Sequence, residues 1–325
     1  MPACWQSRSV RRAVAAPSVA ALSGWLAAEL PQLAGLPVQR LRPVGGGCIH
    51  AAWRVELTNG GSLFAKTNRS STLTMLQAEA DGLRALAQAA VGAPGLTIPT
   101  PLAFGELEGQ AVLVLPWLEL AGSGASGEAW QQLGAALARL HRFSLPLNQG
   151  RGYGFEADNF IGSGPQLNGW LPDWGLFFAE RRLAPQLAWL RRNGVELQGA
   201  EALLELVPQW LSGHRAEPVL VHGDLWSGNA ALLAGGGATI FDPAVHWADR
   251  EVDLAMARLF GGFPAPFFAG YGQEWALPAG AAQRLELYNL YHLLNHANLF
   301  GGGAHGGNYG RQAQASMERL LKQLS

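Results

Sequence analysis

The eight residues from His222 to Asn229 carry the side chains best suited to chemistry, and they read His-Gly-Asp-Leu-Trp-Ser-Gly-Asn. Phosphoryl transfer needs a carboxylate that accepts the proton of the attacking hydroxyl group and an amide oxygen that helps to hold Mg²⁺. Asp224 and Asn229 supply these groups with the five-residue spacing typical of kinase catalytic loops. His222 suits the orientation of the loop by hydrogen bonds better than the role of base, because the nearby aspartate fits that chemistry.

A second carboxylate, Asp242, lies thirteen residues beyond Asn229 and directly follows the apolar segment 239–241. The catalytic loop also follows an apolar segment, residues 219–221. Each segment predicts a short buried strand that presents its polar end at a cleft, and such oxygen ligands are those that Mg²⁺ prefers. We therefore expect Asn229 and Asp242 to hold the metal ion.

Lys66 is one of only two lysines in the chain, whose other basic residues are all arginines. It ends the apolar run 63–65, and a compact ammonium at the end of a buried strand usually has an anionic partner. Here that partner would be a phosphate oxygen. Glu79 lies in line with Leu76 and Leu83 on a predicted helix, where it could pair with Lys66. A glutamate taken alone is more often on a solvated face.

A glycine triplet, Gly45, Gly46 and Gly47, separates two predicted strands. Without side chains, the backbone N–H groups of such a loop approach an anion closely. The alternative is a simple turn, because glycines are common in this chain. The combination carries more weight: glycine loop, lysine, glutamate, catalytic loop and second aspartate follow one another in the order of a kinase-like phosphotransferase.

Hydrophobic periodicity predicts the elements that position these residues. The Asn59-Gly60 dipeptide predicts a hairpin between antiparallel strands. Before the glycine-rich segment 121–127 we expect helices over 18–35 and 72–89 and strands over 38–44, 51–57, 62–67 and 111–115. From Trp130 onward we expect mainly helices, with strands only near 219–221 and 239–241. The fold class is therefore α+β, a protein-kinase-like two-lobe fold with a small antiparallel-sheet lobe carrying one helix and a larger helical lobe. The expected division is a tail over 1–18, a nucleotide-binding lobe over 19–120 and a catalytic lobe over 121–325.

Composition excludes several other classes of protein. The chain has 325 residues, of which 14% are charged, and a net charge of −1, whereas a dedicated nucleic-acid binder normally has a basic excess. Two cysteines, Cys4 and Cys48, are too few for a disulfide framework, so a cytoplasmic location is the default expectation. The longest uncharged stretch, 287–310, is too rich in polar residues and glycine to span a membrane. We expect neither a nucleic-acid partner nor a membrane span.

The segment from His222 to Asn229 resembles the signature of aminoglycoside phosphotransferase-like kinases, and its Leu-Trp-Ser-Gly centre resembles the fructosamine (ketosamine) kinase family. The resemblance runs from about Val44 to the C-terminus. It includes the glycine loop, the segment 154–178, Asp242-Pro243-Ala244-Val245 and the helix around residues 288–296.

This resemblance implies an activity: ATP- and Mg²⁺-dependent phosphorylation of the third-carbon hydroxyl of fructosamines or ribulosamines, free or protein-bound, which releases the glycated amine. It implies Asp224 as the base, Asn229 and Asp242 as Mg²⁺ ligands, Lys66 as the cation at the α- and β-phosphates and Glu79 as its partner. The hinge against which adenine lies would be Leu115, Pro116, Trp117 and Leu118. His246-Trp247-Ala248 departs from the family pattern near the sugar pocket, which leaves the preferred ketoamine open.

Residues suited to a polyol acceptor gather in the catalytic loop and near the C-terminus. They offer stacking faces and hydrogen-bonding groups, and they are Trp226, Tyr291, His292, Asn295 and His296. Core packing is the alternative for such side chains.

Cys48 lies in the glycine loop, where backbone amides and Lys66 would stabilise a thiolate. One hypothesis is a redox-sensitive thiol that forms an intermolecular disulfide, so that the chain is a monomer or a redox-dependent homodimer. The alternative is a small residue packed under a loop.

Two other functions remain open at this point. The first is another small-molecule kinase of the superfamily, acting on an aminoglycoside, choline or homoserine. An aminoglycoside would require an acidic acceptor cleft, but Glu274 and Glu286 are the only acidic residues from 261 to 310. The second is a catalytically silent nucleotide-binding scaffold, which would be expected to lack at least one of Lys66, Asp224, Asn229 and Asp242. All four are present.

Overall fold

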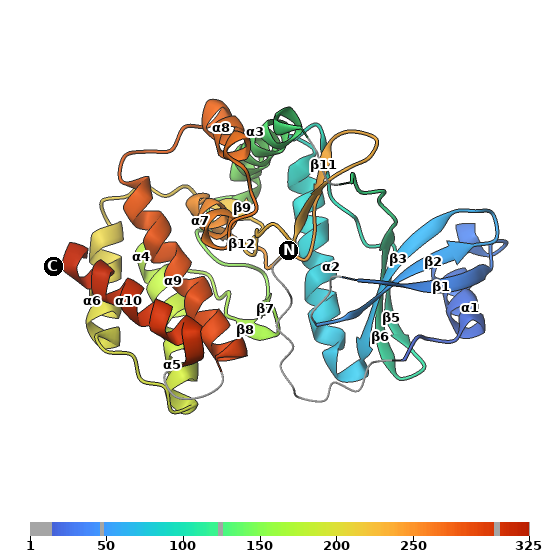
Figure 1. Cartoon of the computed structure of the whole chain (residues 1–325), viewed down its shortest axis with the longest axis horizontal. Helices are drawn as coiled ribbons and strands as arrows, with labels where there is room; N and C mark the ends of the chain where they lie inside the picture. Colours follow the sequence, from blue (N-terminus) through green and yellow to red (C-terminus); the bar gives the residue numbers. More distant parts are fainter. Residues whose placement is uncertain (1–14, 46–48, 123–125, 302–305, 325) are drawn as a thin grey trace.

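The computed structural model of the chain describes residues 15–45, 49–122, 126–301 and 306–324. A lobe built on an antiparallel sheet and a lobe built mainly of helices lie side by side (Figure 1). In chain order the first part contains α1 (Val19–Glu29), a 3₁₀ turn (Pro31–Leu33), β1 (Val38–Val44), β2 (Ala51–Leu57), β3 (Ser62–Arg69), a 3₁₀ turn (Ser70–Thr72), α2 (Leu73–Ala90), β4 (Leu96–Thr97), β5 (Ala103–Leu107) and β6 (Gln110–Pro116).

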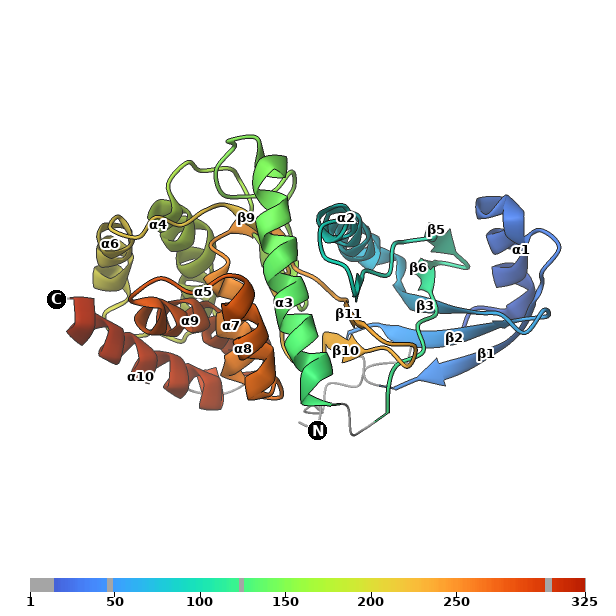
Figure 2. The same ribbon diagram turned by 90° about the horizontal axis from the view of Figure 1, so that it is seen from above.

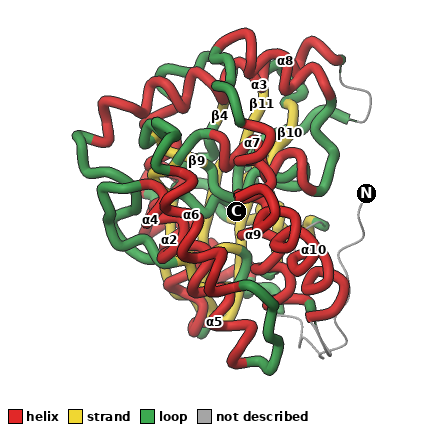
Figure 3. The backbone as a smooth tube through the Cα atoms, turned by 90° about the vertical axis from the view of Figure 1, so that its left-hand side faces the viewer, coloured by secondary structure: helices red, strands yellow, loops and turns green. Residues whose placement is uncertain are grey.

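The remainder of the chain contains α3 (Gly127–Ser144), a 3₁₀ turn (Leu145–Asn148), β7 (Asn159–Ile161), β8 (Gly164–Gln166), α4 (Trp174–Phe177), a π-helical segment (Phe178–Leu183), α5 (Ala184–Arg192), α6 (Ala200–Leu211), β9 (Val219–Val221), β10 (Ala230–Leu232), β11 (Ala238–Ile240), β12 (His246–Ala248), α7 (Glu251–Leu259), α8 (Ala265–Glu274), α9 (Ala281–Phe300) and α10 (Gly307–Leu324). Figure 2 shows α2 and α3 where the two lobes meet, and Figure 3 looks onto the helical lobe. None of the described helices is both long and apolar enough to cross a bilayer.

The five-stranded sheet has the order β1-β2-β3-β6-β5, and every neighbouring pair is antiparallel. The predicted hairpin is confirmed, because β2 and β3 pair across the turn at Asn59 and Gly60. Gly60 adopts a φ of +84°, a conformation that glycine reaches without a steric penalty. The predicted strands 38–44 and 111–115 and the helix over 72–89 are also confirmed within one or two residues.

Alternation along β6 shows how the sheet separates two cores. Val112 and Val114 pack in the cluster that includes Leu22 and Leu26 of α1, whereas Leu113 and Leu115 pack in the cluster that includes α2. Successive side chains of a strand point to opposite faces, so alternate residues of β6 pack in the two different cores. Because Lys66 of β3 pairs with Leu113, it lies on the face that α2 covers. The strand register therefore directs this lysine toward the second lobe.

Two predictions about helices need correction. The helix expected over 18–35 ends at Glu29, and a separate 3₁₀ turn begins at Pro31, because proline cannot continue the hydrogen bonds of an α-helix. The small lobe was expected to carry one helix, but α1 and α2 both pack against its sheet.

Short strands account for the other differences. Strands in the second half were expected only near 219–221 and 239–241, but β7, β8, β10 and β12 also form, and β4 and β5 in the first half were not predicted. All of these strands except β5, which has five residues, are two or three residues long and thus too short to show a periodic pattern. β4 also pairs in parallel with β11, so a strand from the first 120 residues completes a sheet with the second half. The expected division at residue 120 stays a prediction.

Candidate active site

Two short strands bring the catalytic loop and the second aspartate together. β9 and β12 pair antiparallel, with Val221 opposite His246. The chain leaves β9 toward Asp224 and reaches β12 from Asp242, so both carboxylates lie at the same end of this strand pair. The backbone N–H of Ala244 donates to the carbonyl of His222 at 2.8 Å and extends the contact beyond the strands.

Gly223 makes this close approach possible. Its φ is +80°, and a Cβ atom there would lie 2.1 Å from the carbonyl oxygen of Ala244. Any other residue would push the loop away from the segment that follows Asp242.

Asn229 links the two aspartates. Its Nδ2 donates to the backbone carbonyl of Asp224 at 2.9 Å, and it lies 3.3 Å from both Asp224 Oδ2 and the backbone carbonyl of Asp242. The amide nitrogen is thus committed to the protein, which leaves Oδ1 as the atom of this side chain that could bind a metal ion. An amide oxygen together with carboxylate oxygens is a donor set that fits Mg²⁺.

Asp242 has a strained backbone. Its φ is +58°, a left-handed conformation that costs a non-glycine residue of the order of 1 kcal/mol and is found repeatedly at functional sites. Hydrogen bonds on either side hold it there: Phe241 N–H donates to the carbonyl of Asn229 at 3.0 Å, and Ala244 N–H donates to that of His222. The side chain remains 42% exposed, so it is accessible to solvent.

Lys66 joins the two lobes through ion pairs. Its Nζ lies 2.7 Å from Glu79 Oε1 and also contacts Asp242 Oδ1. Burial alone would lower the pKa of Lys66, but the two carboxylates outweigh it and raise the pKa, so the ammonium is retained. Burial raises the pKa of Glu79 to about 7 against the opposing influence of Lys66. Burial also opposes ionisation of Asp242, yet Lys66 holds the pKa of Asp242 below its usual value. One buried ammonium therefore contacts two carboxyl groups. Phosphate oxygens bound beside Lys66 would compete with these carboxyl groups for the ammonium.

The environment of Asp224 suits a general base. Burial and the neighbouring Asp242 carboxylate raise the pKa of Asp224 to about 7, while the hydrogen bond from Asn229 opposes this increase. A base whose pKa lies near the working pH takes up a proton most effectively. The side chain is half-buried, so a bound hydroxyl group can approach it.

The residue that anchors the catalytic loop was not among the predicted site residues. Asp253 of α7 is buried and accepts hydrogen bonds from the backbone N–H groups of His222 and Gly223, both at 2.8 Å, and lies 3.1 Å from His141 Nε2. His222 itself is buried, and its Nε2 lies 2.9 Å from the carbonyl of Phe241. The available signal was an acidic residue directly between the apolar residues Val252 and Leu254 of a helix, because a buried carboxylate requires partners.

A second anchor comes from the β7–β8 hairpin. The buried Gln166 donates to the carbonyl of Ala244 at 3.0 Å, and Asn159 donates to that of Val245 at 2.7 Å. Tyr291 of α9 donates to Gln166 Oε1 at 2.8 Å. These contacts fix the segment after Asp242, and no local pattern in the sequence indicates them.

The structure describes only some of the residues that were predicted to bind the nucleotide. Gly46, Gly47 and Cys48 lie outside the described residues, whereas Gly45 directly follows β1. The expected hinge lies at the end of β6, where Leu115 is buried and Pro116, Trp117 and Leu118 are half-buried. The structure places Leu115 opposite Phe64 of β3, two residues before Lys66.

The five residues predicted to bind the acceptor divide into two groups. Tyr291, His292 and Asn295 are at most 3% exposed, which favours core packing, the alternative already named for them; their contact with the acceptor stays a prediction. They lie on the face of α9 that packs into the core. Trp226 and His296 are half-buried and accessible. The Trp226 ring packs against Gly228, where a Cβ atom would lie 2.2 Å from it.

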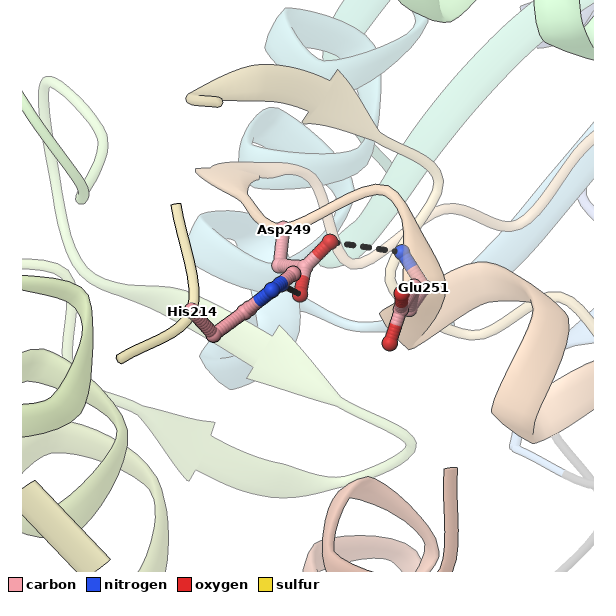
Figure 4. A group of neighbouring side chains, drawn as sticks. All are labelled: His214, Asp249 and Glu251. Carbon is pink, nitrogen blue, oxygen red and sulfur yellow. Dashed lines mark hydrogen bonds and ion pairs between the residues drawn. The ribbon is translucent and has the colours of Figure 1, made fainter. Parts of the chain in front are cut away.

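Another cluster of acidic residues lies at the opposite end of the β9–β12 pair (Figure 4). Asp249 Oδ2 lies 2.7 Å from His214 Nε2 and accepts from Tyr288 Oη at 2.7 Å, and its Oδ1 accepts from the Glu251 N–H at 3.1 Å. Both oxygens of Glu251 accept from Arg284 at 2.8 Å. A metal ion here would have to displace a guanidinium and a hydroxyl group. We therefore interpret this cluster as structural.

Comparisons with known proteins give a consistent result. The sequence profile of the fructosamine kinase family matches residues 26–323. A probable ketoamine kinase of Synechocystis is 41% identical over 299 residues, which cover 91% of this chain and 96% of that protein. The chloroplastic protein-ribulosamine 3-kinase of Arabidopsis thaliana is 35% identical over 291 residues, covering 88% and 84%. The crystal structure of a candidate fructosamine-3-kinase from Haemophilus somnus superposes with a TM-score of 0.80 at 26% identity, covering 93% and 97% of the chains.

Proposed function

The chain belongs to the fructosamine kinase family, and on that premise we propose that it transfers the γ-phosphoryl group of ATP to the third-carbon hydroxyl of a ketoamine. One observation carries the catalytic assignment: Lys66, from the small-lobe sheet, meets Asp224, Asn229 and Asp242, more than 150 residues further along the chain, in one network at the end of the β9–β12 pair.

Each residue then has a defined task. Asp224 accepts the proton of the attacking hydroxyl as the new O–P bond forms and the bond to the ADP oxygen breaks. Asn229 Oδ1 and the Asp242 carboxylate would hold Mg²⁺, which neutralises phosphate charge when bound. Lys66 is positioned by Glu79 and binds phosphate oxygens. Leu115, Pro116, Trp117 and Leu118 form the adenine side of the cleft, and Gly45 belongs to the loop over the phosphates.

The acceptor is a neutral polyol rather than a polycation. An aminoglycoside would need unpaired carboxylates, yet Glu274 is already bound by Arg139 at 3.0 Å and by Arg142 at 3.4 Å. Glu286 is bound by Arg319 at 2.7 Å. With both acids of the 261–310 region committed to arginines, a fructosamine or ribulosamine is the better match. We assign Trp226 and His296 to the acceptor side.

The decisive experiment is coupled ATP turnover with Mg²⁺ on fructosyl-lysine and ribulosyl-lysine, beside kanamycin and choline, with Asp224→Asn as the blank. Turnover of a ketoamine that disappears in the blank would establish both the reaction and the base. Nucleotide binding without turnover of either ketoamine would contradict the proposed acceptor. A glycated protein tested in parallel would show whether the physiological adduct can be protein-bound. Gel filtration with and without reductant would show whether the chain is a monomer or a homodimer that depends on Cys48. The cytoplasmic location stays a prediction.

A further inference from the structure

His50 lies on the face of the small-lobe sheet that carries Lys66. β2 and β3 pair with Ala51 opposite Thr67 and Ala52 opposite Lys66, so the antiparallel register brings His50 opposite Asn68. Side chains two residues apart on a strand share a face, so Asn68 lies on the same face as Lys66. The contact between Asn68 Nδ2 and His50 Nδ1, at 3.0 Å, puts the imidazole on this face as well. His50 is half-buried there.

Asn68 determines which nitrogen of His50 carries the proton. Its Oδ1 accepts from the backbone N–H of Arg69 at 2.8 Å, and its Nδ2 donates to the carbonyl of Ile49 at 3.0 Å. Both partners have a single possible role, so the amide cannot be flipped. Nδ2 therefore also donates to His50 Nδ1, and the proton of the neutral ring lies on Nε2. Within the described part of the chain, Nε2 has no hydrogen-bond partner.

The order of residues along β3 indicates what this free donor meets. The expected adenine hinge is opposite Phe64, because Leu115 pairs with that residue, and Lys66 and then Asn68 follow at intervals of two residues. Each interval spans about 7 Å of strand. A nucleotide that starts at the hinge and passes Lys66 with its inner phosphates would reach His50 with its outermost phosphate.

The electrostatic surroundings agree with a neutral donor. Burial, followed by the nearby Lys66 ammonium, lowers the pKa of His50 to about 4, although Asp242 opposes the decrease. Donation from Nε2–H thus adds a hydrogen bond without adding a second fixed cation beside Lys66.

We propose that His50 is a further nucleotide-binding residue, which donates from Nε2–H to an oxygen of the terminal phosphate and is held in the required tautomer by Asn68. This inference rests on the proposed function, because it takes the adenine to lie at the hinge. It assigns His50 to the recognition of ATP over ADP, a role different from that of Lys66.

Two substitutions at this position separate the chemistry from the shape. Glutamine can place an amide donor near the position of Nε2, whereas asparagine is too short to reach it. We would measure the affinity of the wild-type chain, His50→Gln and His50→Asn for the Mg²⁺ complexes of ADP and of a non-hydrolysable ATP analogue by calorimetry, and check folding by thermal unfolding.

The expected result is a loss of about tenfold in affinity for the ATP analogue in His50→Asn, because a hydrogen bond to a charged group is removed, with less than about threefold change for ADP. His50→Gln should stay within about threefold of wild type for both. Equal losses for the two nucleotides, or a glutamine variant no better than asparagine, would overturn the assignment in favour of a structural role. Binding of neither nucleotide by the wild-type chain would overturn the nucleotide site itself, whereas binding without ketoamine turnover would overturn only the proposed acceptor.

Discussion

Carboxylate side chains lie at both ends of the β9–β12 strand pair, but they differ in how many hydrogen-bond partners they have. At the end near Asp224 and Asp242, the carboxylates have few partners and the Asp242 side chain is 42% exposed. At the far end, Asp249 and Glu251 have every carboxylate oxygen occupied by a hydrogen bond from the protein.

The number of unoccupied carboxylate oxygens distinguishes a reactive acid from a structural one. A carboxylate whose oxygens are all satisfied internally gains nothing from binding a ligand and loses its partners if it does. A carboxylate that is left with spare oxygens is available for a proton or a metal ion. The two ends of one strand pair should therefore respond differently to substitution.

The largest effect is expected at the near end. Asp224→Asn should lower kcat about 10²- to 10⁴-fold, because the general base is removed while the shape of the side chain is kept. Its melting temperature should be unchanged or higher, because the raised pKa of Asp224 means that its ionised form is disfavoured in the folded state. Coupled turnover and thermal unfolding test this together. Retained turnover with a lowered melting temperature would show that Asp224 has a structural role and is not the base.

Arg284→Met should show the opposite behaviour at the far end. It leaves the Glu251 carboxylate buried without its cation, so the free energy of unfolding in urea should fall by about 3–5 kcal/mol. The matched control is Arg319→Met, which breaks a pair whose arginine is exposed and should cost at most about 1 kcal/mol. Similar costs for the two variants would contradict the structural role of the far end. The affinity of Arg284→Met for nucleotide should remain that of the wild type.

His292 differs from the acids at the far end, because it is a buried polar group with no partner on either ring nitrogen among the described residues. Burial lowers the pKa of His292 to about 3, so between about pH 3 and 6.5 the unfolded chain binds a proton that the folded chain does not. Stability should therefore fall on acidification, by at most about 1.4 kcal/mol per pH unit from this group. His292→Leu should reduce the dependence of urea unfolding on pH between 6.5 and 5. A tenfold rise in the KM for ketoamine would instead return His292 to the acceptor site.

The smallest effect expected is the response of the far end to metal ions. Added Zn²⁺ should leave the melting temperature within about 1 °C, because His214, Asp249 and Glu251 are already paired. Mg²⁺ together with ADP should raise the melting temperature through the near end, and Asp242→Asn should lose the part that depends on Mg²⁺. Stabilisation by Zn²⁺ that vanishes in His214→Ala would show that the far end binds metal after all.

Much of the fold followed from local patterns. The alternation of β3 and the Asn59-Gly60 turn predicted the hairpin that presents Lys66, and helical spacing predicted that Glu79 faces inward; the structure confirms the hairpin and the ion pair. The strands β7, β8, β10 and β12 were missed because each is only three residues long and exists through its partner strand.

The candidate site divides in the same way. The spacing of Asp224 and Asn229 was visible in the sequence, but their supports were not. Asp253, Gln166 and Asn159 act through backbone groups, and hydrogen bonds to the backbone leave no mark on the residue type of the partner. The burial of Tyr291, His292 and Asn295 was likewise invisible, because aromatic and hydrogen-bonding side chains suit a binding site and a packed core equally well.

Residue type and local spacing were enough to identify the residues that carry the chemistry and their order, because they decide what a side chain can donate, accept or bind. Which carboxylates remain available depends on the folded arrangement of the chain. Asp249 and Glu251 are satisfied by residues 33 to 39 positions away, whereas Asp224 and Asp242 keep spare oxygens within the described part of the chain. Whether a polar group is satisfied depends on contacts between distant segments, and these exist only once the chain has folded.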